Sequence, residues 1–192
     1  MPLQFSAKAQ IRPSDEKLRE LILLISEWSQ ADPKFGAIKL NKLLFHADFS
    51  SFLTYGEPIT GQDYFKLPQG PAPRRLKALT ESMKKTGDFA WQEISYFGRI
   101  QKKPIALRAA DPTKFSGAEI NLVRQTVQKF WKMSATEISE QSHLFLGWKA
   151  AHLQETIPYS TALVSRRSPT EQERKRGLAL QGLAEKHLRA RS

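Results

Sequence analysis

Helix-start signals followed by apolar residues at helical spacing are the feature that most constrains the fold of this chain. Ser14, with Asp15 and Glu16 behind it, opens a segment with apolar residues at helical spacing at Leu18, Leu21, Ile22, Ile25 and Trp28. A second helix is predicted over 37–55, where Gly56 supplies the stop. Capping boxes pair Ser116 with Glu119 and Ser134 with Glu137. The sequence therefore predicts a helical core.

Further helices are predicted from weaker signals. One runs over 73–86 and ends at Gly87, and the helix that starts at Ser134 is expected to break near His143 before it continues through Trp148. Ser168, Pro169 and Glu171 predict the start of a basic C-terminal helix. We expect six side chains of the core to be largely buried: Trp28, Leu43, Leu44, Val127, Phe130 and Trp131.

Strands fit only between these helices. The aromatic and β-branched residues of 89–97 and the run 100–108, separated by Gly98 and Arg99, predict a hairpin whose second strand carries Pro104 and therefore lies at an edge. A short extended piece at 63–66 is expected to join this sheet. The fold class is thus α+β and mostly helical: a helical core, a small antiparallel sheet and a C-terminal helix. We predict one domain over 1–167, with its motifs in about 14–160, a linker at 165–168 and a helical extension over 168–192.

Composition excludes several classes of protein. The chain of 192 residues has 40% hydrophobic residues, enough for a packed core, and no cysteine, which removes disulfides and thiolate metal sites. Its longest unbroken apolar run, 21–25, is far shorter than the roughly 20 residues of a membrane span. No secretory signal is evident in the first ten residues. These features predict a cytoplasmic protein with no membrane partner.

The positive charge is concentrated in one part of the chain. The net charge is +11, and residues 1–60 carry seven basic and seven acidic side chains, so the whole excess lies in 61–192. A basic surface attracts nucleic acid, anionic membrane or an acidic protein, and the number alone does not choose among them. We expect weak, non-specific binding of nucleic acid at low salt.

No pattern in the sequence indicates catalysis or a cofactor. The four histidines have no metal-ligand spacing, and no phosphate-binding loop or serine-nucleophile motif is present. We therefore expect no enzyme activity, no metal and no cofactor.

The helix predicted after Pro73 breaks a local rule. Other predicted helices carry acidic residues in the first turn, whereas this one opens with Arg74 and Arg75, the unfavourable sign for the helix dipole. Two guanidinium groups beside free backbone N–H groups would suit the binding of an acidic side chain or a phosphate. The alternative is that both arginines simply extend into solvent. The preceding segment 56–73 is rich in glycine and proline, which favours one fixed loop path. Such a loop is either a recognition surface or a structural crossover between two elements.

Three blocks of residues follow one another in a recognisable order. The first is 39–48 (KLNKLLFHAD), the second comprises 55–61 (YGEPITG) with Tyr64 and Gly70-Pro71, and the third is 135–143 (ATEISEQSH) with Trp148 and 157–159. Together these blocks resemble the Panacea domain of SocA-like antitoxins, and the resemblance covers about 14–160. This sequence departs from the family pattern at Phe45, Lys66 and Ala72, which affects details of the loop.

The resemblance implies an antitoxin that neutralises a cognate protein toxin, many of which attack translation, by direct binding without catalysis. The complex is expected to contain the toxin and one or more copies of this chain; the resemblance leaves their number open. The expected partner-binding residues are His46, Tyr64, Gly70, Pro71, Arg74, Arg75 and His143. Packing is the alternative role for His46 and His143, and a nucleic-acid-binding regulator that uses the basic residues of 61–192 is the alternative function.

Overall fold

The computed structural model describes residues 11–96, 98–164, 170–172 and 174–179. Its helices, short 3-10 turns (η) and strands follow one another as α1 (Asp15–Trp28), α2 (Ala37–Tyr55), β1 (Tyr64–Leu67), β2 (Gly70–Pro73), α3 (Leu76–Lys85), β3 (Phe89–Tyr96), β4 (Arg99–Ala106), η1 (Pro112–Lys114), α4 (Gly117–Lys129), α5 (Ala135–His143), α6 (Leu146–Ala150) and η2 (Tyr159–Leu163). The predicted class, mostly helical α+β, is confirmed.

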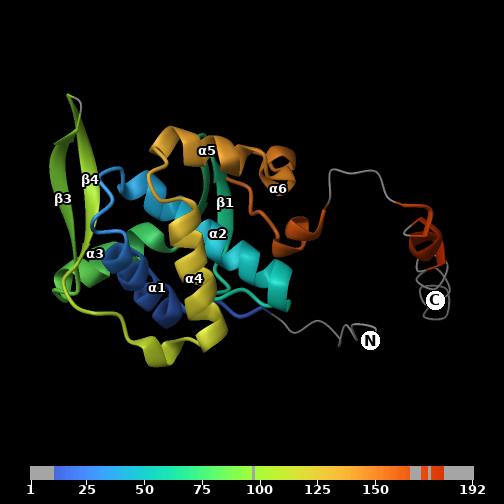
Figure 1. The fold of residues 1–192 in the computed structure, drawn as a ribbon, viewed down its shortest axis with the longest axis horizontal. Helices are drawn as coiled ribbons and strands as arrows, with labels where there is room; N and C mark the ends of the chain where they lie inside the picture. The colour runs from blue at the N-terminus through green and yellow to red at the C-terminus, as the bar shows by residue number, and fades with distance from the viewer. Residues whose placement is uncertain (1–10, 97, 165–169, 173, 180–192) are drawn as a thin grey trace.

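Helix α2 runs through the middle of the molecule, with α1 and α4 beside it and the β3–β4 hairpin at the end opposite α6 (Figure 1). The main core buries apolar residues of α1, α2 and α4, and it includes Leu21, Leu43, Leu44, Val127 and Phe130. Trp28 and Trp131 are partly buried and pack against this core, whereas Leu43, Leu44, Val127 and Phe130 are buried, as expected for all four. Trp28 is the last residue of α1, and Trp131 follows the end of α4 by two residues.

The predicted helix boundaries are confirmed where local chemistry specifies them. The Ser14 side chain accepts a hydrogen bond from Lys17 N, and the capping boxes at Ser116 and Ser134 are both formed. Helix α2 ends at Gly56, which adopts φ +83°. The break after α5 comes at His143, as predicted. Residues 171–172 and 174–179 are helical, whereas the predicted start at Ser168 and Pro169 lies outside the described residues.

The strands form two separate antiparallel hairpins. Strands β3 and β4 pair from Phe89↔Ala106 to Tyr96↔Arg99, which confirms the predicted hairpin. The segment at 63–66 does not join this sheet, contrary to expectation. As β1 it pairs with β2, which lies in the segment predicted to be a loop of fixed path. Segment 154–157 covers the other edge of β1, through Lys66 N to Glu155 O (3.0 Å) and Ile157 N to Tyr64 O (2.8 Å). The proline-bearing β2 is left at the edge, where missing N–H groups are tolerated.

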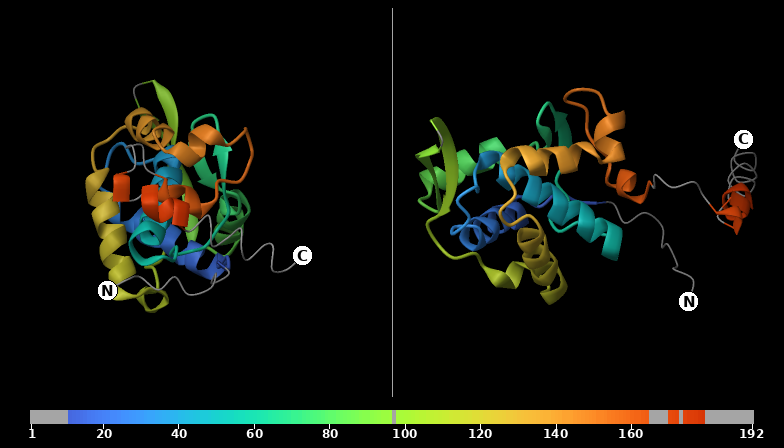
Figure 2. Two further views of the ribbon diagram at one scale, coloured as in Figure 1. Left: turned by 90° about the vertical axis from the view of Figure 1, so that its right-hand side faces the viewer. Right: turned by 45° about the horizontal axis from the view of Figure 1, so that its top comes forward.

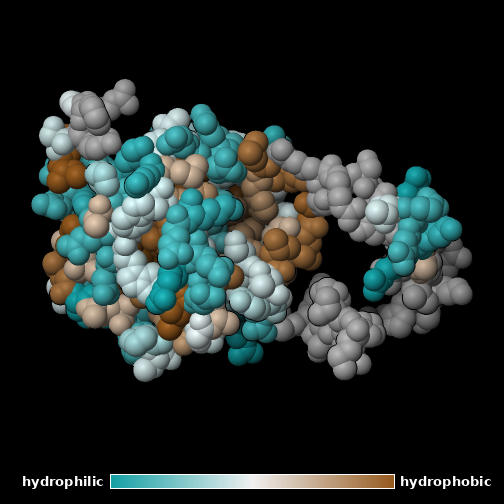
Figure 3. Space-filling view, in the orientation of Figure 1, coloured by the Kyte–Doolittle hydropathy of each residue, from teal (hydrophilic) through white to brown (hydrophobic). Residues whose placement is uncertain are grey.

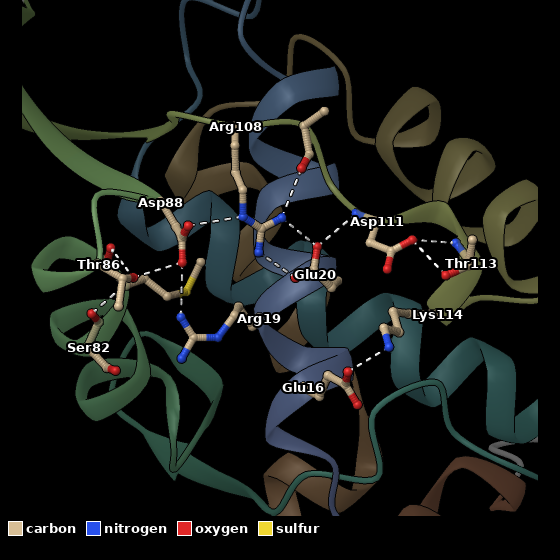
Figure 4. A network of polar contacts seen from close by, with 12 residues as sticks. Glu16, Arg19, Glu20, Ser82, Thr86, Asp88, Arg108, Asp111, Thr113 and Lys114 are labelled. Carbon is tan, nitrogen blue, oxygen red and sulfur yellow. Dashed lines mark hydrogen bonds and ion pairs between the residues drawn. The ribbon is translucent and has the colours of Figure 1, made fainter.

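A polar network fixes the β3–β4 hairpin against α1 (Figure 4). Arg108, just beyond β4, places Nη2 2.6 Å from Glu20 Oε1 on α1 and Nε 3.0 Å from Asp88 Oδ1. The pKa of Glu20 lies below its usual value, mainly because Arg108 donates hydrogen bonds to its carboxylate. The network lies among α1, β3 and β4 and has a structural role.

Candidate functional site

Most of the residues expected to bind a partner meet at the β1–β2 hairpin. Tyr64 begins β1, and Gly70 and Pro71 begin β2. The hairpin stands beside α5 and α6 (Figure 2, right). His143 is the last residue of α5, and His46 lies in α2. Arg74 directly follows β2.

Tyr64 is a buried anchor of the hairpin. Its side chain is 0% exposed, and its hydroxyl donates to Asp48 Oδ2 at 2.8 Å. Asp48 also accepts hydrogen bonds from Thr60 N at 2.7 Å and from the Thr60 hydroxyl. Burial raises the pKa of both Asp48 and Tyr64. Sequence reasoning did not single out Asp48 as a site residue, although a carboxylate within the apolar run of α2 was a usable signal.

An aromatic cluster packs against Tyr64 on the side of α2. Phe45 and Phe49 of α2 contact the Tyr64 ring edge-on, at centroid distances of 5.8 and 5.5 Å. Phe145 and Tyr159 complete the cluster. The Tyr159 hydroxyl donates to Gln62 O at 2.8 Å, so the segment before β1 is fixed as well.

At Gly70 the backbone of the hairpin turn lies in close contact with Lys42 of α2. It adopts φ +100°, and a Cβ atom at this position would lie 2.7 Å from Lys42 Cε and would also collide with Ser142 Oγ. The carbonyl oxygen of the next residue, Pro71, accepts a hydrogen bond from Lys42 Nζ at 3.2 Å. Only glycine fits this close approach at this backbone conformation.

Lys42 is the most unusual charged group of the site. It is 2% exposed, and no carboxylate of the described residues pairs with it. Burial lowers its pKa to about 7. Lys39, one turn earlier and equally buried, donates instead to Asp32 Oδ2 at 2.5 Å. Sequence reasoning missed Lys42, because a lysine on a helix is usually exposed.

The two histidines are packed rather than free. The ring of His46 stacks on Phe130 at 4.4 Å, and that of His143 stacks on Trp148 at 4.0 Å. The Nε2 atom of each is buried without a hydrogen-bond partner among the described residues. Burial lowers the pKa of His46 to about 3 and also lowers that of His143; the charge of Lys42 adds to both shifts.

The two arginines occupy different surroundings, and neither lies in the first turn of a helix. Helix α3 begins at Leu76 rather than Pro73, so Arg75 is its N-cap residue and Arg74 precedes it. Arg75 Nη2 pairs with Asp15 Oδ2 at 2.5 Å, so an acidic side chain of the chain itself occupies it. Arg74 lies over the Phe65 ring at 4.7 Å and donates to Gln154 O at 2.6 Å.

Lys66 contacts Trp148 of α6 on the side of β1 that also carries Tyr64. Lys66 Nζ lies 4.4 Å from the centre of the Trp148 ring and donates to Ala151 O at 2.9 Å. The Trp148 indole donates to Leu67 O at 3.2 Å. We use the name hairpin face for five side chains around β1: Phe65 and Arg74 on one side of the strand, and Lys66, His143 and Trp148 on the other. It carries cations and aromatic rings, several of them at positions fixed by hydrogen bonds.

An exposed apolar area adjoins the hairpin face where α6 and η2 lie, at the right-hand edge of the molecule's body in Figure 3. Large apolar side chains that are at least half exposed in this region and at the end of α2 are Leu53, Tyr55, Leu144, Leu153, Leu163 and Val164. Exposed apolar patches frequently mark protein interfaces.

The described part of the chain has no helix that could span a bilayer and no cluster of side chains that could hold a metal ion. None of its helices combines the length and apolar character needed to cross a bilayer. Among the same residues, no three His, Asp or Glu side chains are grouped so that they could hold a metal ion.

Comparison with known proteins identifies the family. The family model described as Antitoxin SocA-like, Panacea domain, matches residues 40–149, which include most of α2, both hairpins, α4, α5 and most of α6. No curated protein and no solved structure gave a significant match. The matched segment is more than half of the chain and contains the hairpin face, so the chain belongs to the SocA-like antitoxin family with a Panacea domain.

Proposed function

We propose that this protein neutralises a cognate protein toxin in the cytoplasm by forming a direct complex with it, without catalysis. Membership of the SocA-like antitoxin family is the observation that carries this proposal. Its toxin is proposed to be one that attacks translation, and the complex can contain more than one copy of the antitoxin.

The hairpin face is the proposed contact surface. Arginine and tryptophan are enriched among the residues that dominate binding energy at interfaces, and Arg74 and Trp148 are both held there by hydrogen bonds. A side chain already fixed in the free protein loses less conformational entropy on binding. The adjoining apolar area supplies contact surface that can be buried in the complex.

The remaining expected residues are assigned supporting roles. Tyr64, Gly70 and Pro71 are buried, so they act by fixing the path of the hairpin rather than by touching the toxin. His46 has the same role from α2. Arg75 stays at the margin of the surface, where Asp15 neutralises it.

Co-expression with the toxin encoded beside it tests the proposal. Wild type should restore growth and co-purify with the toxin, whereas Arg74→Glu should do neither if the hairpin face is the contact. Arg124→Glu is the matched control, because Arg124 also lies over an aromatic ring, Trp28, at 5.4 Å but belongs to α4. Thermal unfolding of the free proteins checks that both variants fold. Failure of wild type to restore growth or to co-purify would refute the function; full rescue by folded Arg74→Glu would refute the surface.

A further inference from the structure

The hairpin face and the helix beneath it hold positive charges that lack carboxylate partners. Elsewhere in the described chain, ion pairs join cations to acids, as in Lys17–Glu119, Arg19–Asp88 and Lys39–Asp32. No ion pair among the described residues joins Lys42 or Lys66 to a carboxylate: Lys42 Nζ is bound to Pro71 O, and Lys66 Nζ to Ala151 O and the Trp148 ring. Both amino groups are therefore fixed in place without a carboxylate as counterion.

These groups lie close to one another around the turn of the hairpin. Lys66 of β1 pairs with Pro71 of β2, the residue whose carbonyl oxygen accepts from Lys42. The charges of Lys42 and Lys66 both act on His143, and each disfavours its protonated form. Glu140, which is exposed and lies one turn earlier on α5, acts in the opposite direction, because its negative charge raises the pKa of His143.

Such an arrangement is unfavourable in the free protein and favourable around an anion. Two lysines close together repel each other, and a lysine that is 2% exposed has lost its hydration without gaining a counterion. A carboxylate brought against Lys66 and His143 would feel the Lys42 charge through a poorly screened interior. Conflicts of this kind concentrate at functional sites.

We propose that Lys42, Lys66 and His143 form an anion site that binds a carboxylate of an acidic side chain of the toxin. Lys66, which is half-buried, touches the carboxylate, His143 borders the site, and Lys42 supplies positive charge from the interior side. This inference rests on the proposed function and names the chemistry that the toxin presents.

A protein carboxylate fits this site better than a nucleic-acid backbone does. Affinity for a nucleic-acid backbone grows with the number of phosphates that exposed cations neutralise, so it favours an extended basic stripe. Here Lys42 is covered, and Arg74, on the other side of β1 from Lys66, is engaged with Gln154 O and Phe65. The site therefore presents one point of positive charge, which matches a single acidic side chain.

The test uses the purified toxin as the probe and measures the dissociation constant of its complex at several salt concentrations. Lys66→Met should weaken the complex at least about tenfold, as expected when one partner of a buried charge pair is removed, and should flatten the dependence on salt. Lys42→Met should act in the same direction. Lys149→Met is the matched control, since Lys149 is exposed on α6 beside Trp148, and it should change little. In wild type, the pKa of His143 followed by NMR should rise when the toxin binds.

The outcomes separate this inference from the function on which it rests. If wild type forms no complex, the proposed function fails. If wild type binds while folded Lys66→Met and Lys42→Met bind equally tightly with unchanged salt dependence, the function stands and the anion site is refuted. Tight binding of duplex DNA or RNA at about 150 mM salt, lost in Lys66→Met, would also overturn the carboxylate assignment in favour of phosphate.

Discussion

Replacing Lys42 by methionine should stabilise the free protein at neutral pH and remove a pH dependence. Burial lowers the pKa of Lys42 to about 7, against 10.5 for the unfolded chain. Between these values the unfolded state binds the proton more strongly, so the free energy of unfolding rises with pH. From pH 7 to about pH 9.5 this gain amounts to about 3 kcal/mol for wild type. Methionine has a similar length and no charge, so the contribution disappears.

Urea unfolding followed by tryptophan fluorescence at several pH values in this window measures the effect. Wild type and Lys42→Met should differ most at pH 7 and converge as the pH rises. Ionisation of the tyrosines at higher pH affects both proteins alike, because both keep Tyr64 and Tyr159. Lys39→Met should show the opposite sign, since it leaves Asp32 buried without its partner. Parallel curves for wild type and Lys42→Met would refute the claim that Lys42 is a buried, unpaired cation.

Three further substitutions test the packing around the site by their effect on the free energy of unfolding. Phe130→Ala should cost about 3–5 kcal/mol, because the ring is 2% exposed and stacks on His46; an unchanged melting temperature would contradict the core assignment. Gly70→Ala should cost more than Gly56→Ala, since both have positive φ but only the former meets Lys42; equal losses would argue against the close approach. Asp48→Asn should cost about 1–3 kcal/mol, because an amide cannot accept all the hydrogen bonds from Thr60 and Tyr64; a neutral effect would show that this anchor is dispensable.

Helix boundaries could be predicted because the interactions that set them lie within a few residues. The Ser116 and Ser134 capping boxes each join residues three positions apart, and the stop at Gly56 needs only its own backbone conformation. The family resemblance likewise pointed to Tyr64, Gly70 and Pro71 of the hairpin, because a motif depends only on which residues follow one another along the chain.

The contacts that build the site could not be predicted in the same way. The β1–β2 hairpin was missed because Pro71 and Pro73 are typical of loops, and because the segment that covers β1, at 154–157, is distant in sequence. The partner of Arg75, Asp15, lies 60 positions away. Lys42 stands out only in three dimensions, where the turn at Gly70 covers its side chain.

The measurement that tests the central claim most directly is a titration of the purified toxin with purified antitoxin in a cell-free translation reaction. Neutralisation by a direct complex predicts that toxin activity falls in proportion to the antitoxin added and is lost at a fixed molar ratio. Folded Arg74→Glu should shift this titration to higher concentration, whereas Arg124→Glu should not. Complete neutralisation by a small fraction of a molar equivalent would contradict the account, because it would require catalysis; no effect of excess antitoxin on an active toxin would contradict it as well.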